Sequence, residues 1–332
     1  MGKRIHYLDI AKGILILLLL VSHYGSARRR LDVSNDYFYL FDSWQFIFRA
    51  FFMQAFFIIS GYCSNFNKPF KPFFKTQFKQ LIIPFISFEI LSAIFWAART
   101  GDLSFHFILS FIFNDTWTVY WFLNALFFSK IVVWFINRIT PNQLYLILIT
   151  LFLFVSGIII NHYNLGRNIF CIRESLGSCL FVAVGFVLRN RTKLYNMLLN
   201  LCIYIYPVIL ILLFFTGIKI PVFAAGMHVT LSQVPIFFIT TLTGTFACLR
   251  MCKVLDRNKF LEFWGKKTLI VYCTHFWGLI LIIPIIFNWF NPISPYSAIS
   301  YYILIYLLEI VFCWLIIKLF SSKYLKWAIG SF

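Results

Sequence analysis

The first apolar run of the chain reads YLDIAKGILILLLLVSHY from Tyr7 to Tyr24. Three ionisable residues, Asp9, Lys12 and His23, interrupt this run. At ~100° per residue in an α-helix, Lys12 and His23 return to within ~20° of each other, and Asp9 falls within ~60° of both. The run therefore predicts a membrane-spanning helix that carries one polar stripe.

The stripe is long enough to link a membrane surface to the protein interior. A rise of ~1.5 Å per residue separates the backbones of Lys12 and His23 by roughly 16 Å, about half the hydrocarbon thickness. Ionisable groups at such depths are costly in lipid and usually face a protein interior or a water-filled cavity. This helix is therefore our first candidate for a functional site.

The composition indicates an all-α, polytopic membrane protein. The 332 residues are 61% hydrophobic and 12% charged, whereas a soluble domain is about 25% charged. Because the stretches between apolar runs are short, we expect one membrane domain over residues 1–332.

Segment 102–115 is too short to span and is expected to lie in the outer interface or to dip into the protein. Ten spans are predicted, at residues 8–25, 45–63, 80–97, 117–137, 143–161, 175–188, 199–217, 232–249, 267–287 and 299–320.

The net charge of +18 is explained by membrane topology and does not require nucleic acid as a partner. With the N-terminus in the cytoplasm, the inner segments hold 19 basic residues, the outer segments 7 and the spans 3. Positive charge collects on the cytoplasmic side of membrane proteins. We therefore expect a multi-pass protein of the cytoplasmic (inner) membrane, with both termini in the cytoplasm and the lipid bilayer as its partner.

The first span has an alternative interpretation as a signal peptide. Basic residues precede it, and the small residues 25–27 (Gly-Ser-Ala) resemble a cleavage site. However, Asp9 and Lys12 would interrupt the apolar core of a signal peptide, and many spans follow. We therefore expect this helix to be kept.

The eight cysteines do not predict a metal site. None of them forms a paired Cys-x-x-Cys motif with nearby histidines. Most lie within apolar spans, where cysteine behaves as a small buried hydrophobe. Whether Cys171 and Cys179, which flank the start of one span, form a disulfide is left open.

His23 is the best-placed candidate for a general base. An imidazole with an ordinary pKa near 6.5 can accept a proton from a hydroxyl at working pH, but a histidine in a span can also simply hydrogen-bond a neighbouring helix. Lys12 has two interpretations as well. Its amine either reaches the cytoplasmic headgroups or serves as a cationic partner for Asp9 or for an anionic substrate.

Four short motifs resemble, in the same order, those of the acyltransferase 3 family of integral-membrane O-acyltransferases. They are YLDIAKG at 7–13 with ten residues between Lys12 and His23, FFIISGY at 56–62, WFL at 121–123 and GKKTLIVYCTH at 265–275. The sequence DIAKG at 9–13 is most similar to the family branch of fucose 4-O-acetylases. Two departures stand out: Gln77 and Gln80 occupy the positions of an Arg-x-x-Arg pair found in many relatives, and Thr268 replaces the usual serine.

The resemblance implies an acetyltransferase that takes its acyl group from cytoplasmic acetyl-CoA or another acyl-CoA, with no bound cofactor or metal. The acceptor would be a hydroxyl of a cell-surface or lipid-linked sugar, and His23 would be the general base. The substrate-binding candidates are Lys12, Asp9, Ser60, Tyr62, Trp121, Asn124 and His275.

Several of these residues have simpler alternatives. His275 lies in the middle of a span, where a histidine more often packs between helices than takes part in catalysis, and Ser60 with Gly61 can allow two helices to approach closely. Tyr62 and Trp121 can stack on a sugar ring or anchor the chain at the membrane interface.

A different class of function is a non-catalytic exporter of polysaccharide or another solute, in which the polar stripe would line the pathway. Such transporters often have helices broken by Gly or Pro at matching places in two symmetric halves. Gly217 and Pro221 mark one such break, and the first half shows no counterpart. The stripe that ends at His23 and the ordered motifs favour the enzyme.

Overall fold

A computed structural model describes residues 4–39, 45–101, 104–106, 109, 120–140, 142–165, 168, 171–223 and 229–330. These residues form helices and no strand, which confirms the predicted all-α class. Nine of the helices are long and apolar enough to cross a membrane, so the protein is a multi-pass membrane protein. Much of the predicted interfacial segment 102–115 lies outside the described residues.

Nine of the ten predicted spans coincide with these helices. They are His6–Arg30, Phe46–Cys63, Phe70–Thr100, Trp121–Ile139, Gln143–His162, Thr192–Thr216, Leu231–Val254, Thr268–Trp289 and Pro295–Phe320. The tenth prediction, at 175–188, corresponds to helix α11 (Ile172–Asn190). Arg173, Glu174 and Arg189 make α11 more polar than the other nine.

The helices group into two compact units, each with its own packing. The first contains Met1–Phe52 and Cys248–Leu325, and the second contains Met53–Ala247 and Lys326–Phe332. The first unit therefore combines two segments that are far apart in the sequence.

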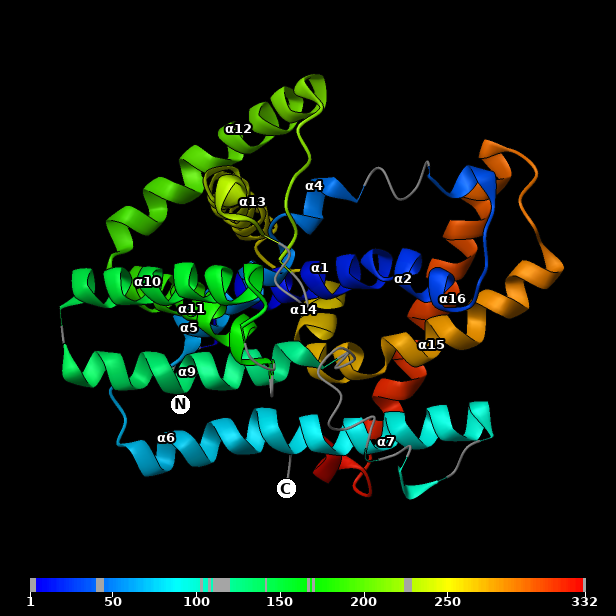
Figure 1. Ribbon diagram of the computed structural model, residues 1–332, viewed down its shortest axis with the longest axis horizontal. Coiled ribbons are helices and arrows are strands. Elements are labelled where there is room, and N and C mark those ends of the chain that lie inside the picture. Colours follow the sequence, from blue (N-terminus) through cyan, green and yellow to red (C-terminus); the bar gives the residue numbers. More distant parts are fainter. Residues whose placement is uncertain are drawn as a thin grey trace. The chain divides into compact units, whose positions relative to one another are not determined.

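The first unit is built around α1 (His6–Ser22), which α2 (Tyr24–Arg30) follows after a break of one residue (Figure 1). The short helix α14 (Lys259–Lys266) packs along α1, and α15 (Thr268–Trp289) and α16 (Pro295–Phe320) form a helical hairpin. At the start of α16, Ser294 Oγ accepts the N–H of Ser297, and Ser297 Oγ accepts the N–H of Ser294. This capping box, followed by a proline at the first helical position, fixes where α16 begins. Two short helices, η1 (Asp36–Phe38) and α4 (Phe46–Arg49), complete this unit.

Helices α1 and α14 meet backbone to backbone because each has a glycine at the contact. A Cβ atom on Gly13 would overlap the carbonyl oxygen of Leu261, and one on Gly265 would overlap the carbonyl oxygen of Asp9. Only glycine allows this approach, which brings α14 directly against the polar half of α1.

The second unit is a helical bundle in which α9, α10 and α11 lie side by side (Figure 1). The span Phe70–Thr100 changes pitch at a π turn over residues 78–82. The cause is Pro84, which lacks the N–H that an α-helix would direct to the carbonyl of Gln80. The elements of the second unit are α5 (Phe52–Cys63), α6 (Phe70–Gln77), η2 (Phe78–Ile82), α7 (Ile83–Thr100), α9 (Trp121–Ile139), α10 (Gln143–His162), α11, α12 (Thr192–Thr216), η4 (Leu231–Gln233), α13 (Val234–Val254) and η5 (Lys326–Ile329). The last residues of α13, from Cys248, belong to the first unit.

Close packing also explains the glycine of the second sequence motif. A Cβ atom on Gly61 would overlap the carbonyl oxygen of Val182 on α11, and one on Gly185 would overlap that of Ile58 on α5. The alternative that this motif allows two helices to approach closely is therefore confirmed for Gly61. The disulfide left open between Cys171 and Cys179 is not formed, because both thiols are free.

Candidate active site

The break between α1 and α2 falls at His23, whose ring meets the ring of His275 on α15. The two ring centroids lie 4.7 Å apart, with an interplanar angle of 71°. Phe276 borders both imidazoles, with its ring centroid 6.4 Å from each. The side chain of His275 is fully buried. The structure therefore brings together two histidines that are about 250 residues apart in the sequence.

Hydrogen bonds to the backbone fix the tautomer of both rings. His23 Nδ1 lies 3.0 Å from the carbonyl oxygen of Leu19, and His275 Nδ1 lies 2.8 Å from that of Tyr272. A carbonyl oxygen can only accept, so we assign the ring proton to Nδ1 in each case and the lone pair to Nε2. Within the described part of the chain, His275 Nε2 has no hydrogen-bond partner.

Ser22 adds to the anchoring of the His23 ring. Its Oγ donates to the Leu19 carbonyl over 2.8 Å and lies 3.1 Å from His23 Nδ1. The ring is thus held from its Nδ1 side, which leaves Nε2 to act on another molecule. An imidazole in this state is a proton acceptor of the kind that general-base catalysis requires.

Of two arginines on α2 that lie over aromatic rings, Arg30 brings positive charge close to the histidine pair. The Arg30 guanidinium lies 5.3 Å above the ring centroid of Phe276, and that of Arg28 lies 4.3 Å above the ring of Phe38. Both distances are in the range of cation–π contacts. Arg30 is therefore one aromatic ring away from the two imidazoles.

Asp9 and Lys12 form an ion pair at the other end of α1. The Lys12 ammonium lies 2.7 Å from Asp9 Oδ1, and Arg4 Nε donates to Oδ2. The hydrogen bond to Asp9 raises the pKa of Arg4, so this guanidinium stays charged. Between Lys12 and His23, the positions on the same side of the helix are the buried residues Ile16 and Leu19. The two polar groups of α1 are thus separated by apolar residues.

A second ionic cluster, which the sequence analysis did not identify, fastens α14 to α1. Glu262 Oε1 lies 3.2 Å from His6 Nδ1, and Oε2 lies 3.2 Å from the Lys266 ammonium. Arg257 donates to the other nitrogen of His6 over 3.2 Å. The hydrogen bond from His6, followed by that from Lys266, lowers the pKa of Glu262 below its ordinary value. The i,i+4 spacing of Glu262 and Lys266 was the one local sign of this cluster.

The four remaining candidates lie in the second unit, on α5 and α9. The ring of Trp121 packs 6.4 Å from Phe57 and 6.1 Å from Phe223, so it is a core residue rather than an interfacial anchor. Asn124 follows one turn later and is buried, and within the described residues its Nδ2 has no hydrogen-bond partner.

The other two candidates of this unit are less buried. Ser60 lies one turn after Phe57 on α5 and is half-buried. Tyr62 packs against Tyr195, with 5.3 Å between the ring centroids.

The structure also explains one departure from the family pattern. Gln77, at a position where many relatives have arginine, accepts a hydrogen bond of 3.0 Å from the ammonium of Lys130 on α9. Both side chains are buried. The positive charge of this region is therefore supplied by a lysine from another helix.

Helix α16 carries a buried carboxyl group beside Gly278, which lies one turn after His275 on α15. Glu309 is fully buried, accepts a hydrogen bond of 3.5 Å from Cys313 Sγ, and fills the space beside Gly278 on α15. In the part of the chain that the structure describes, no cluster of three His, Cys, Asp or Glu side chains is arranged to hold a metal ion.

The fold and the site define a polytopic helical membrane protein with two facing imidazoles inside one of its units. The sequence profile of the acyltransferase 3 family, described as an acyltransferase domain, matches residues 5–318. The chain therefore belongs to the acyltransferase 3 family and is a membrane acyltransferase. No curated protein and no solved structure matches it.

Proposed function

We propose that this protein is a membrane O-acetyltransferase that moves an acetyl or other acyl group from cytoplasmic acyl-CoA to a hydroxyl of a cell-surface or lipid-linked sugar. The observation that carries the proposal is the pair of His23 and His275, whose Nδ1 atoms are both bound to backbone carbonyls. Membership of the acyltransferase 3 family supports the reaction class.

His23 acts as the general base in this proposal. Its Nε2 accepts the proton of the acceptor hydroxyl while the oxygen attacks the thioester carbon. The C–S bond then breaks, the CoA thiolate takes up the proton, and the products are the sugar ester and free CoA. No covalent acyl-enzyme is needed if donor and acceptor are bound together.

His275 has a supporting role in the same step. Its ring stands edge-on to His23 at 4.7 Å and is itself held by the carbonyl of Tyr272. It limits the movement of the His23 ring, and its Nε2 offers an acceptor for a second hydroxyl of the sugar. A buried nitrogen without a partner is costly, so a ligand hydroxyl at this position would be stabilising.

Lys12 acts at a different place from His23. Their backbones are roughly 16 Å apart along the helix, which is too far for both side chains to act on one atom. We assign Lys12 and its partner Asp9 to the binding of the anionic donor or to the positioning of α1. Ser60, Tyr62, Trp121 and Asn124 are candidates for contact with the sugar.

The charge distribution supports the sidedness of the proposed reaction. The segments assigned to the cytoplasm hold 19 of the 29 basic residues, which supports cytoplasmic termini in the inner membrane and a cytoplasmic donor.

The test compares transfer of radiolabelled acetyl from acetyl-CoA to the glycans of native membranes by wild type and three variants. General-base assistance is worth about 10²–10⁴-fold, so His23→Ala is expected to lower the rate by that factor at equal abundance. Lys12→Ala is expected to recover in part at high acetyl-CoA, whereas His23→Ala is not. His162→Ala, at the exposed end of α10, serves as the matched control.

Two results would contradict the proposal. Wild-type turnover by His23→Ala would reject this histidine as the base. Failure of every acyl-CoA tested to support transfer by the intact protein would instead favour the exporter.

A further inference from the structure

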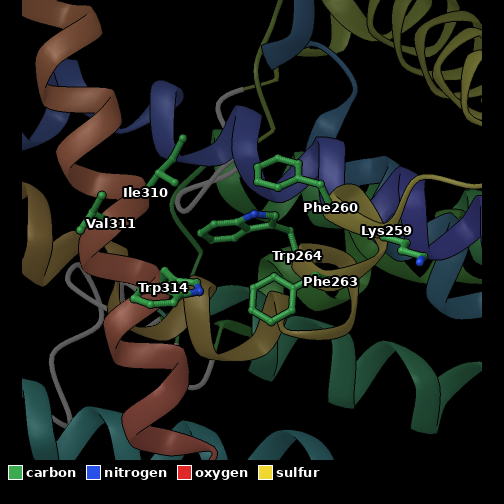
Figure 2. Close-up of a pocket in the computed structure, with 7 residues that line it drawn as sticks. All are labelled: Lys259, Phe260, Phe263, Trp264, Ile310, Val311 and Trp314. Atoms are coloured by element: carbon green, nitrogen blue, oxygen red, sulfur yellow. The ribbon is translucent and has the colours of Figure 1, made fainter.

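An apolar groove lies between α14 and α16 in the first unit, apart from the histidine pair. Its volume is about 590 Å³, within the range of small-molecule sites, about 300–1,000 Å³. It is lined by Lys259, Phe260, Phe263, Trp264, Ile310, Val311 and Trp314 (Figure 2). Figure 2 shows the aromatic rings of α14 on one side of the groove and the side chains of α16 on the other.

The groove is open to the surroundings of the protein. Phe260, Val311 and Trp314 are 56%, 52% and 41% exposed, although they are large apolar residues. In a membrane protein, such a face is covered by lipid or by another protein. Because α15 and α16 form a hairpin, α14 and the C-terminal end of α16 lie on the same side of the membrane. The basic residues assign this side to the cytoplasm.

Two lysines bring positive charge to the groove, one at each end of its lining. Lys259 is one of the lining residues, and the Lys318 ammonium lies 3.5 Å above the ring centroid of Trp314. Within the described ranges, neither lysine forms an ion pair with a carboxylate. The acidic residue of α14, Glu262, is engaged by His6 and Lys266 instead. The groove therefore combines an apolar interior with two cations that have no carboxylate partner among the described residues.

We propose that this groove binds one anionic glycerophospholipid of the cytoplasmic leaflet. An acyl chain lies between the aromatic rings of α14 and the side chains of Val311 and Trp314. The phosphate is held by Lys318 beside Trp314, and Lys259, at the other end of the lining, adds to the positive field at the membrane surface. A zwitterionic lipid fits the groove equally well but brings its own cation toward the two lysines, so the charge of the headgroup decides the preference. This site is independent of the acyltransferase reaction.

The experiment measures lipid binding to the purified, delipidated full-length protein by intact-complex mass spectrometry. Dioleoylphosphatidylglycerol is expected to bind more tightly than dioleoylphosphatidylcholine. Each lysine near a membrane surface contributes about a fivefold preference for anionic lipid. Lys259→Gln and Lys318→Gln are therefore each expected to weaken binding of the anionic lipid about fivefold, and the double variant roughly 25-fold. Lys193→Gln, which alters an exposed lysine at the start of α12, should change neither affinity.

A second variant tests the groove itself. Val311→Trp adds volume at an exposed position, so it fills the groove without strain in the core. We expect it to reduce binding of both lipids at this site. Equal affinities for the two lipids in the wild type, or an unchanged preference in both lysine variants, would overturn the proposal. It would also be overturned if the groove proved to be covered by a second copy of the chain, seen as a dimer that Val311→Trp dissociates.

Discussion

Replacement of Gly265 by alanine tests the contact that holds α14 against α1. A Cβ atom at this position would overlap the Asp9 carbonyl oxygen and would lie 3.1 Å from the Gly13 nitrogen. Both are backbone atoms within a helix, so neither can rotate out of the way. Helix α14 must therefore move away from α1 to accommodate the methyl group.

The size of the effect follows from this displacement. To reach the ordinary contact range of 3.4–4 Å, α14 must retreat by more than ~1 Å from the carbonyl of Asp9. Overpacking of this kind typically costs about 1–3 kcal/mol. For a chain of this size, this corresponds to a decrease of about 2–6 °C in Tm. The retreat also separates His6 from Glu262, now 3.2 Å apart, so we expect the upper half of the range.

Thermal unfolding in detergent, followed with a thiol-reactive fluorophore, provides the assay. Seven of the eight cysteines are buried and become reactive only when the protein unfolds. Gly157→Ala is the matched control, because its Cβ atom would meet its nearest neighbour at 3.1 Å and thus needs only a small adjustment. It should change Tm by less than ~2 °C.

The double variant with Gly13→Ala gives a further check. One retreat of α14 relieves both clashes, so the two substitutions together should cost less than the sum of their separate effects. If Gly265→Ala melts within about 1 °C of the wild type, or if the two effects are additive, these glycines do not set the distance between α14 and α1.

Three further predictions concern other parts of the molecule. Because the folded-state pKa of Glu262 is lowered, its contribution to stability is present above the ordinary glutamate pKa of about 4.3 and is lost as the pH falls through the folded-state value. Glu262→Gln should therefore lower Tm at pH 7, and its difference from the wild type should vanish once the pH is below this folded-state pKa; a constant difference would argue against this assignment. Gln77→Arg should destabilise the fold by about 3 kcal/mol or more, because it places a second cation beside the buried Lys130, and Lys130→Gln should restore the melting temperature. A reporter fused after Arg191 should lie in the cytoplasm and one after Asn288 outside it, and the opposite result would reverse the topology and the donor side.

The sequence predicted most of the fold because hydrophobic length alone identifies membrane helices. It also identified His23 as the candidate base and His275 as part of a motif. It did not show that these two rings meet, because a contact between residues about 250 positions apart depends on how the helices pack. The same limit applies to the cation beside Gln77. The sequence shows that arginine is missing there but not that Lys130 from α9 replaces its charge.

For the ionic clusters of α1, the sequence likewise indicated some contacts and missed others. Pairing of Lys12 with Asp9 was one of the alternatives that the sequence left open for this lysine, and the structure shows this ion pair. The role of Arg4 was missed, because a basic residue before the first span is equally well explained by membrane topology. The pairing of His6 with Glu262 was missed because it joins residues about 250 positions apart in the sequence.

The order of synthesis gives the ion network of α1 a role during biogenesis. Helix α1 is made before α14 and α15, which leave the ribosome about 250 residues later. At ~5–20 residues per second, this is a delay of roughly 10–50 s. During this interval α1 lacks the helices that later cover it. Both ionic partners of Asp9, namely Arg4 and Lys12, belong to the same short segment, so this carboxylate is neutralised as soon as the helix forms. The newly made span can therefore remain in the bilayer until α14 and α15 are inserted, without an unpaired carboxylate at Asp9.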